Sequence, residues 1–150
     1  MGKKRVIKGK KEELIKEGEK IDEKIKKTVK IKEAKRVREG KIYISSSYNN
    51  TVITLTDLRG NTLGWTSAGN IGFKGTKKAT PFAASKVAGR ICEIAQKLGM
   101  EKVDIIIKGV GSGRESAIRS LATHGLDINS IKDLTPIPHN GCRPPKVRRV

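Results

Sequence analysis

A short apolar run at residues 103–107 limits the folds that this chain can adopt more than any other stretch. Only Asp104 interrupts it, and a strand of this composition is expected at the centre of a sheet with both faces covered. Glycines follow at positions 109, 111 and 113, and an amphipathic segment then extends to Gly125. This segment is predicted to be a helix, because glycine readily adopts the positive φ that ends one. The strand, turn and helix together predict a crossover to a parallel strand.

The rest of the chain contains further strand patterns and one long helix pattern. Runs of β-branched residues that alternate with polar ones predict strands at residues 42–44, 51–56, 62–68 and 126–131. Thr80 and Pro81 suit the N-cap and the first position of a helix. Its expected buried face contains Ala84, Val87, Ala88, Ile91, Ala95 and Leu98, and its expected solvent face contains Lys86, Arg90, Glu93 and Lys97. Residues 69–78 are expected to form a glycine-rich loop, and Trp65 to lie in the core.

The element order β-β-β-α-β-α-β predicts an α/β fold with a single domain. Three strands joined by short turns should form an antiparallel meander, and the later strands should be parallel, which gives a five-stranded mixed sheet with helices packed on it. We expect a charged N-terminal extension at residues 1–40, disordered or marginally helical in the free protein. A globular α/β domain is expected at residues 41–135 and an extended basic tail at residues 136–150.

The positive charge of the chain is concentrated on its ends. The formal net charge is +18, and residues 140–150 contain four Lys/Arg and no Asp/Glu. Prolines at 136, 138, 144 and 145 should keep this tail extended until a polyanion orders it. A segment with this much positive charge attracts nucleic acid or an anionic membrane surface. Solubility alone would not require the charge to be concentrated on the tails. The sequence has no run of ~20 apolar residues and no signal-peptide pattern, so we expect a cytoplasmic protein without a membrane partner.

Motifs for catalysis are incomplete. The glycines at 109, 111 and 113 resemble a dinucleotide loop, but Arg114 stands where that motif needs glycine. The Gly-Lys-Ser/Thr ending of a Walker loop is absent, and the strands lack the clustered carboxylates of a two-metal nuclease. His139 and Cys142 have ligand-like spacing without a second pair, which argues against zinc. We therefore expect no enzyme activity, no cofactor and no metal.

Four long motifs follow one another along the chain: SSSYNNTVITLTDLRGNTLGWTSAG, GFKGTKKATPFAASKVAG, KGVGSGRESAIRSL and TPIPHNGCRPPKVRRV. In this order they resemble the bacterial-type small-subunit ribosomal protein eleven family, and the resemblance covers about residues 40–150. It implies a ribonuclease-H-like sheet and a structural role in the small ribosomal subunit. It also implies a place on the subunit platform, where the protein would bridge ribosomal RNA helices beside the messenger exit path. The partners that it implies are small-subunit rRNA, nearby mRNA, platform proteins seven and eighteen, and the third initiation factor.

The residues expected to bind RNA come from several segments. The hydroxyl, amide and aromatic side chains of one turn are Ser45, Ser46, Ser47, Tyr48, Asn49 and Asn50, and the cations of the domain are Lys74, Lys77, Lys78, Arg114 and Arg119. The glycine loop contributes Gly111, Ser112 and Gly113, whose N–H groups would meet a phosphate at a helix N-terminus unless the loop is only a tight turn. The tail contributes His139, Asn140, Arg143, Lys146, Arg148 and Arg149.

The low aromatic content, 3%, argues against a platform that stacks single-stranded bases. Folded RNA, recognised by its backbone and shape, is therefore the expected target. Tyr48 and Phe73 are open cases, since each could stack on a base or fill the core. The alternative function is a free-standing basic nucleic-acid chaperone, or a nuclease-fold relative without a catalytic site.

Overall fold

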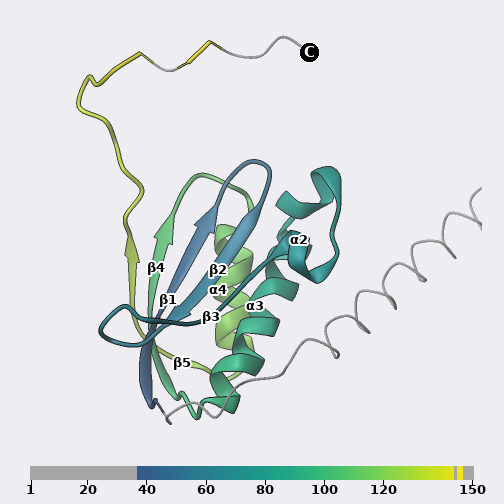
Figure 1. The fold of residues 1–150 in the computed structure, drawn as a ribbon, viewed down its shortest axis with the longest axis vertical. Coiled ribbons are helices and arrows are strands. Elements are labelled where there is room, and N and C mark those ends of the chain that lie inside the picture. The colour runs from purple at the N-terminus through teal and green to yellow at the C-terminus, as the bar shows by residue number, and fades with distance from the viewer. Residues whose placement is uncertain (1–36, 144, 147–150) are drawn as a thin grey trace, which may run out of the picture.

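The computed structural model describes residues 37–143 and 145–146. Most of the extension expected at residues 1–40, together with Arg148 and Arg149, therefore lies outside the described residues. The strands are β1 (Glu39–Ser46), β2 (Thr51–Thr56), β3 (Thr62–Ser67), β4 (Lys102–Lys108) and β5 (Asp127–Asp133). The helices are α2 (Ala68–Ile71), the 3-10 helix η1 (Gly75–Ala79), α3 (Pro81–Lys97) and α4 (Gly113–Thr123). Figure 1 shows this arrangement.

The five strands form one mixed sheet in the order β3-β2-β1-β4-β5. β1 pairs antiparallel with β2, and β2 with β3, so the predicted meander is confirmed. β4 lies parallel to β1 and to β5, as the crossover through a helix requires. The α/β class, the element order and the ribonuclease-H-like topology are therefore as expected. The observed strands extend beyond the predicted 42–44, 103–107 and 126–131 by a few residues at one or both ends.

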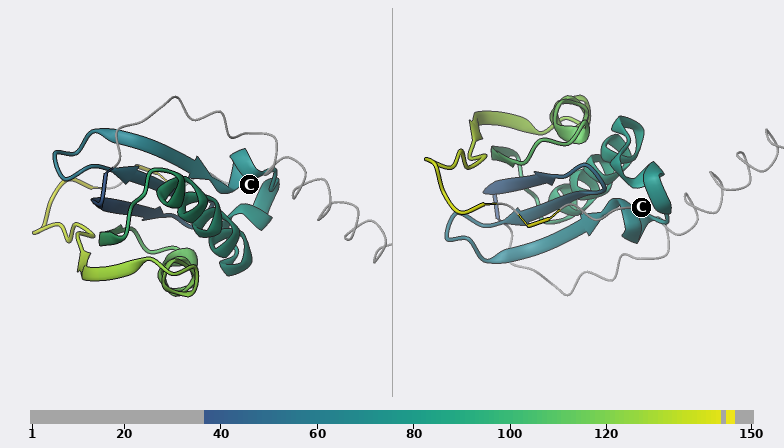
Figure 2. Two further views of the ribbon diagram at one scale, coloured as in Figure 1. Left: turned by 90° about the horizontal axis from the view of Figure 1, so that it is seen from below. Right: turned by 90° about the horizontal axis from the view of Figure 1, so that it is seen from above.

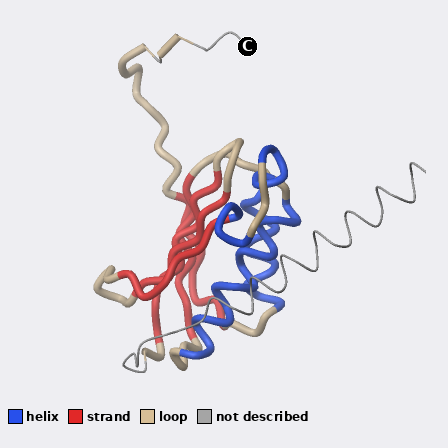
Figure 3. Tube along the Cα trace, turned by 45° about the vertical axis from the view of Figure 1, so that its right-hand side comes forward, coloured by secondary structure: helices blue, strands red, loops and turns tan. Residues whose placement is uncertain are grey.

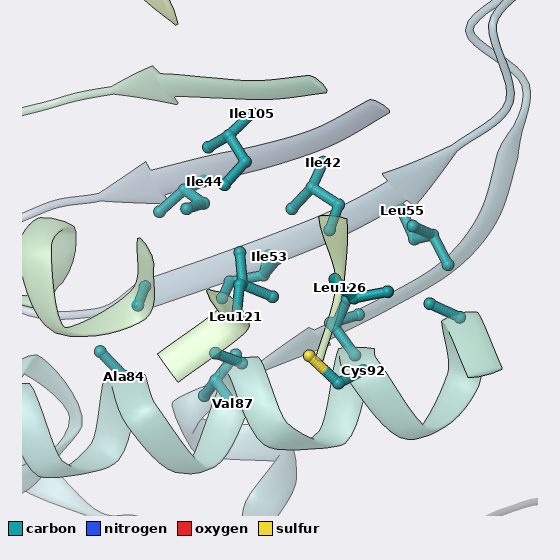
Figure 4. Close-up of a cluster of buried hydrophobic side chains, with 14 of the residues drawn as sticks. Ile42, Ile44, Ile53, Leu55, Ala84, Val87, Cys92, Ile105, Leu121 and Leu126 are labelled. Carbon is teal, nitrogen blue, oxygen red and sulfur yellow. The ribbon is translucent and has the colours of Figure 1, made fainter. Parts of the chain in front are cut away.

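One face of the sheet forms the core. Ile42 and Ile44 of β1, Ile53 of β2 and Ile105 of β4 are almost completely buried, and Figure 4 shows them facing α3. Side chains alternate between the two faces of a strand, so these residues occupy every second position. Burying an isoleucine of this kind contributes roughly 1.5–3 kcal/mol to the free energy of unfolding.

Both long helices cover the same face of the sheet. Figure 3 shows the helices on one side of the strands, and in Figure 2 α4 is seen nearly end-on beside α3. The expectation that residues 103–107 are covered on both faces was therefore wrong. Asp104 and Ile106 lie on the other face and are partly exposed. The apolar composition of β4 reflects its central position between β1 and β5 rather than a second helix layer.

Helix α3 begins and ends as the sequence predicts. The Thr80 hydroxyl accepts a hydrogen bond from the backbone N–H of Ala83, 3.3 Å away, and Gly99 follows the helix with a φ of 74°. The six apolar residues expected on its inner face are all buried. Arg90 was expected in solvent but is only 7% exposed, and its guanidinium forms a 2.6 Å ion pair with Glu93.

Two smaller expectations were also wrong, and the structure decides one case that the sequence left open. The loop expected at residues 69–78 contains α2 and η1, because the Ser67 hydroxyl caps α2 and Gly72 ends it with a φ of 117°. Trp65 is 58% exposed instead of buried, because it lies on the uncovered face of the sheet. Phe73 fills the core rather than a base-binding site, since it is 9% exposed and its ring packs edge-on against another aromatic.

Candidate RNA-binding surface

The segments expected to bind RNA meet at one end of the domain. β1, β4 and β5 are parallel, so their carboxyl ends lie at the same edge of the sheet. The hairpin turn after β1, the loop after β4 and the tail after β5 all leave from this edge, and α2 and η1 follow β3 there (Figure 1). We call this edge the loop end. It brings together residues that are up to about a hundred positions apart in the sequence.

The glycines after β4 let this loop approach the hairpin. Gly109 has a φ of 102°, and a side chain there would overlap the Ser46 carbonyl oxygen. Gly111 and Gly113 do not have positive φ, but neither position has room for a side chain. A Cβ at Gly113 would lie 2.6 Å from Thr51 Oγ1 and 2.9 Å from Ala84 Cβ. These glycines therefore allow the loop to pack closely against the domain itself.

Hydrogen bonds hold the loop in place. The N–H of Gly111 donates to the Ser46 carbonyl oxygen over 3.0 Å. The Ser112 hydroxyl donates to the Ala79 carbonyl oxygen of η1 over 2.8 Å. Since the Gly111 amide already has an acceptor, it is not available for the phosphate contact that the sequence suggested. These bonds join the hairpin, the loop and η1 into one connected unit.

The hairpin turn presents its tip to solvent. Tyr48 is 79% exposed, and Asn49 beside it is also exposed. The Ser47 hydroxyl accepts hydrogen bonds from the N–H groups of Asn49 and Asn50, at 3.4 and 3.1 Å, and thus shapes the turn. Ser46 is 1% exposed and lies 3.5 Å from the Thr51 hydroxyl, so it serves the fold and does not suit an RNA contact. Of Tyr48 and Phe73, the two aromatic residues that the sequence left undecided, Tyr48 is therefore better placed to stack on a base.

The lysines of η1 add positive charge beside the loop. Lys74 precedes η1, and Lys77 and Lys78 lie in its last turn, where cations also interact favourably with the carbonyl end of a helix. Lys74 and Lys77 are exposed and Lys78 is half-buried. The bond from Ser112 to Ala79 fixes this basic segment against the glycine loop. Arg119 differs, because it lies about 9 Å further along α4 than Gly113 and away from the loop end.

Arg114 is committed to contacts within the domain. Its guanidinium donates to the Gly109 carbonyl oxygen over 2.7 Å and forms an ion pair with Asp133. The Asp133 carboxylate also accepts hydrogen bonds from the hydroxyl and the N–H of Thr135, at 2.6 and 2.9 Å. The Thr135 bonds, and then Arg114, lower the pKa of Asp133 to about 2. The charge of Arg114 is therefore largely balanced by contacts within the domain.

The same network sets where the tail leaves the sheet. Thr135 Oγ1 accepts a hydrogen bond from the Gly109 N–H, 3.1 Å away, and the Leu134 N–H donates to the Ile107 carbonyl oxygen. Residues 136–143 are exposed and have no helix or strand, and Asn140 has a positive φ of 52°. The predicted contacts described in the tail are His139, Asn140, Arg143 and Lys146. Figure 1 shows residues 136–143 extending away from the domain.

Residues 37–143 and 145–146 contain no group of three His, Cys, Asp or Glu side chains that could hold a metal ion. Within the same ranges, no helix is both long and apolar enough to cross a membrane. Cys92 is buried and Cys142 exposed, and both are unpaired thiols. The geometry of the loop end suits the binding of a polyanion through exposed polar tips and cations.

Comparison with known proteins identifies the family of this chain. Residues 40–149 match the family described as "Ribosomal protein S11". The chain is 57% identical over 116 residues to "Small ribosomal subunit protein uS11" of Treponema pallidum, both in strain Nichols and in a second strain, of subspecies pallidum. Each match covers 77% of this chain and 92% of the relative. The chain belongs to the ribosomal protein S11 family. S11 proteins are structural, non-enzymatic constituents of the small ribosomal subunit in translation.

Sequence reasoning missed the residues that organise the loop end. Asp133 and Thr135 are not cations and carry no binding motif, yet they fix the base of the tail. One available signal was the Asp-x-Thr spacing, in which a carboxylate commonly bonds the N–H two residues later. The use of Ser112 as a link to η1 had no local signal, because its partner Ala79 is 33 positions away.

Proposed function

We propose that this S11-family chain binds small-subunit rRNA through its loop end and bridges rRNA helices on the platform of the subunit, near the mRNA exit path and the Shine-Dalgarno cleft. The observation that supports this most is the convergence of the hairpin tip, the glycine loop and η1 at one edge, with the basic tail leaving from the same edge. A domain that presents a compact contact and an extended one can reach two RNA elements at once. The proposed location is the cytoplasm, as part of the small subunit.

The contacts at the loop end favour recognition of folded RNA. Hydroxyl, amide and lysine side chains bond phosphate and sugar oxygens, which positions a protein without reading sequence. Tyr48 and Asn49 form the tip that would enter a groove, and Lys74, Lys77 and Lys78 would neutralise phosphates beside it. The tail cations Arg143, Lys146, Arg148 and Arg149 would extend this neutralisation over a second helix. Proposed neighbours are ribosomal proteins seven and eighteen, mRNA and the third initiation factor.

Footprinting on small-subunit rRNA tests this proposal. Hydroxyl-radical cleavage of the subunit reconstituted with and without the chain should show protection in two separate helices. Removal of residues 143–150 should erase one set of protections, and Tyr48→Ala with Lys77→Gln should weaken the other. Protection of a single helix, unchanged by either alteration, would contradict the bridging role. A chain released from the subunit by a high-salt wash would instead favour a free-standing nucleic-acid chaperone.

A further inference from the structure

The face of the sheet opposite the helices carries a row of side chains that the loop end does not use. Strand register places five residues side by side across all five strands: Trp65, Thr54, Tyr43, Ile106 and Lys132. A second row lies one step nearer the loop end and consists of Ser67, Val52, Ser45 and Lys108. We call these nine residues the open sheet face.

The aromatic residues of this face are accessible. Trp65 is 58% exposed and Tyr43 is 37% exposed, whereas Thr54 between them is half-buried. Among the described residues, the helices lie on the other side of the sheet (Figure 3). The chain has five aromatic side chains in total (two Tyr, two Phe and one Trp), and two of them share this one row. Their low number therefore does not exclude a stacking surface, because the fold concentrates them.

The charge of the open sheet face is positive. Lys108 and Lys132 lie at its margin, and neither row contains a carboxylate. The nearest carboxylate in the register, Asp104, lies one step further from the loop end. It accepts hydrogen bonds from Ser130 and Asn129, at 2.7 and 3.0 Å. A flat aromatic surface with lysines on one margin is complementary to a ligand that has planar rings and an anionic backbone.

The spacing of the two rings suits two separate bases. Neighbouring strands lie ~4.8 Å apart, and Tyr43 and Trp65 are two strands apart, so their backbone positions are about 10 Å apart. Four-stranded sheets in RNA-binding modules use aromatic residues in this way, with one base on each ring. We propose that the open sheet face binds single-stranded RNA, with bases stacked on Trp65 and Tyr43 and with phosphates near Lys108 and Lys132.

The open sheet face is continuous with the loop end. Ser45 leads into the hairpin turn, Lys108 leads into the glycine loop, and Ser67 caps α2. A strand that leaves a folded RNA bound at the loop end would therefore run directly onto this face. The proposal concerns a second surface and a different form of RNA, so it can fail while the loop-end proposal holds, and the reverse is also true.

The only tryptophan of the chain provides a direct reporter. The full-length protein is titrated with a nine-nucleotide oligouridylate, an oligoadenylate of equal length and the duplex of the two. We expect both single strands to quench Trp65 fluorescence, because a stacked base lies against the indole ring. We expect the duplex to quench much less, since its bases are already stacked inside the helix.

Substitutions then separate stacking from general charge attraction. Tyr43→Ala should weaken oligouridylate binding roughly tenfold, and Trp65→Leu should do the same when binding is followed with a labelled oligonucleotide. The matched control is Phe82→Ala, which removes an aromatic ring that is 63% exposed on α3, in the helix layer. Lys108→Gln should flatten the salt dependence more than Lys97→Gln, which removes an equal charge from α3. Circular dichroism melting checks that each variant is folded.

Three results would overturn the proposal. If the oligonucleotide binds without quenching Trp65 fluorescence, it binds to the basic tail and not to the open sheet face. Unchanged affinity in Tyr43→Ala, as in the control Phe82→Ala, would show that charge alone accounts for the binding. If the free chain self-associates and Trp65 becomes shielded from acrylamide, the open sheet face is a contact between two copies of this chain. Tyr43→Ala should retain affinity for a folded platform rRNA fragment, and this measurement reports on the loop end separately.

Discussion

The backbone N–H of Gly109 donates a hydrogen bond to Oγ1 of Thr135, 3.1 Å away, and thereby ties the loop after β4 to the first residues of the tail. The two residues are 26 positions apart and follow neighbouring parallel strands. Because Gly109 has positive φ and no side chain, its amide can reach this acceptor. The direction in which the tail leaves the domain is thus part of the fold.

The contacts of Gly113 predict a stability effect rather than a pure binding effect. Gly113→Ala would bring a methyl group to 2.6 Å from Thr51 Oγ1 and 2.9 Å from Ala84 Cβ. Overpacking of this kind should lower the free energy of unfolding by about 1–3 kcal/mol in urea denaturation. Gly69→Ala is the control, since its nearest neighbour would be 3.7 Å away. Equal stability of the two variants would mean that the Gly113 site relaxes without cost.

The Asp133 network predicts a pH dependence at low pH. Its hydrogen bonds hold the pKa of Asp133 at about 2, below the ordinary 3.8. A carboxyl with a lowered pKa stabilises the fold above the ordinary value, and this contribution is lost as pH falls through about 2. In NMR titration of the intact protein, the Thr135 amide signal should therefore change with a midpoint near 2. Thr135→Val should raise the pKa of Asp133, and a wild-type midpoint near 4 would contradict the network.

The tail should contribute to RNA binding without stabilising the free domain. Deletion of residues 143–150 removes four cations, and residues 136–142 just before them are exposed. We expect little change in melting temperature. The slope of log affinity for platform rRNA against log salt should flatten by up to about three to four. A lower melting temperature with an unchanged slope would show that the tail packs on the domain.

The two cysteines should differ sharply in reactivity. Cys92 is 1% exposed, and burial, with a further contribution from Glu93, raises the pKa of its thiol to about 11. Cys142 is exposed in the tail. Since the thiolate is the reactive form, iodoacetamide at pH 8 should label Cys142 first and Cys92 only after denaturation. Labelling of both at similar rates in the folded protein would indicate frequent opening of α3.

Much of the fold could be predicted because its signals are local. The Thr80–Pro81 start of α3 and the spacing of its apolar residues depend only on neighbouring positions. The apolar pattern of β4 was informative in the same way, but it could not distinguish coverage of both faces from a central place in a sheet with one covered face. Trp65 was misplaced for the same reason, since a strand pattern does not show which face the helices occupy.

The sequence indicated which segments make up the candidate site, but not which contacts each of their residues forms. Most of the segments that contain the residues expected to bind RNA are gathered by the fold at one edge of the sheet, and Arg119 on α4 is an exception. The hydrogen bonds and ion pairs of individual side chains and amides depend on partners that are far away in the sequence. Arg114 meets Asp133, Gly111 meets Ser46, and only the folded chain shows that these groups are already engaged.

The bonds that pin the glycine loop to the hairpin and to η1 affect how binding responds to temperature. A contact surface that is already rigid loses little conformational freedom on binding, whereas an extended tail must be ordered at that moment. The tail's share of the affinity should therefore carry the larger unfavourable entropy and decline faster on warming. In the proposed complex, heating would therefore dissociate the tail from RNA first, while the glycine loop and the hairpin still hold the domain in its original orientation.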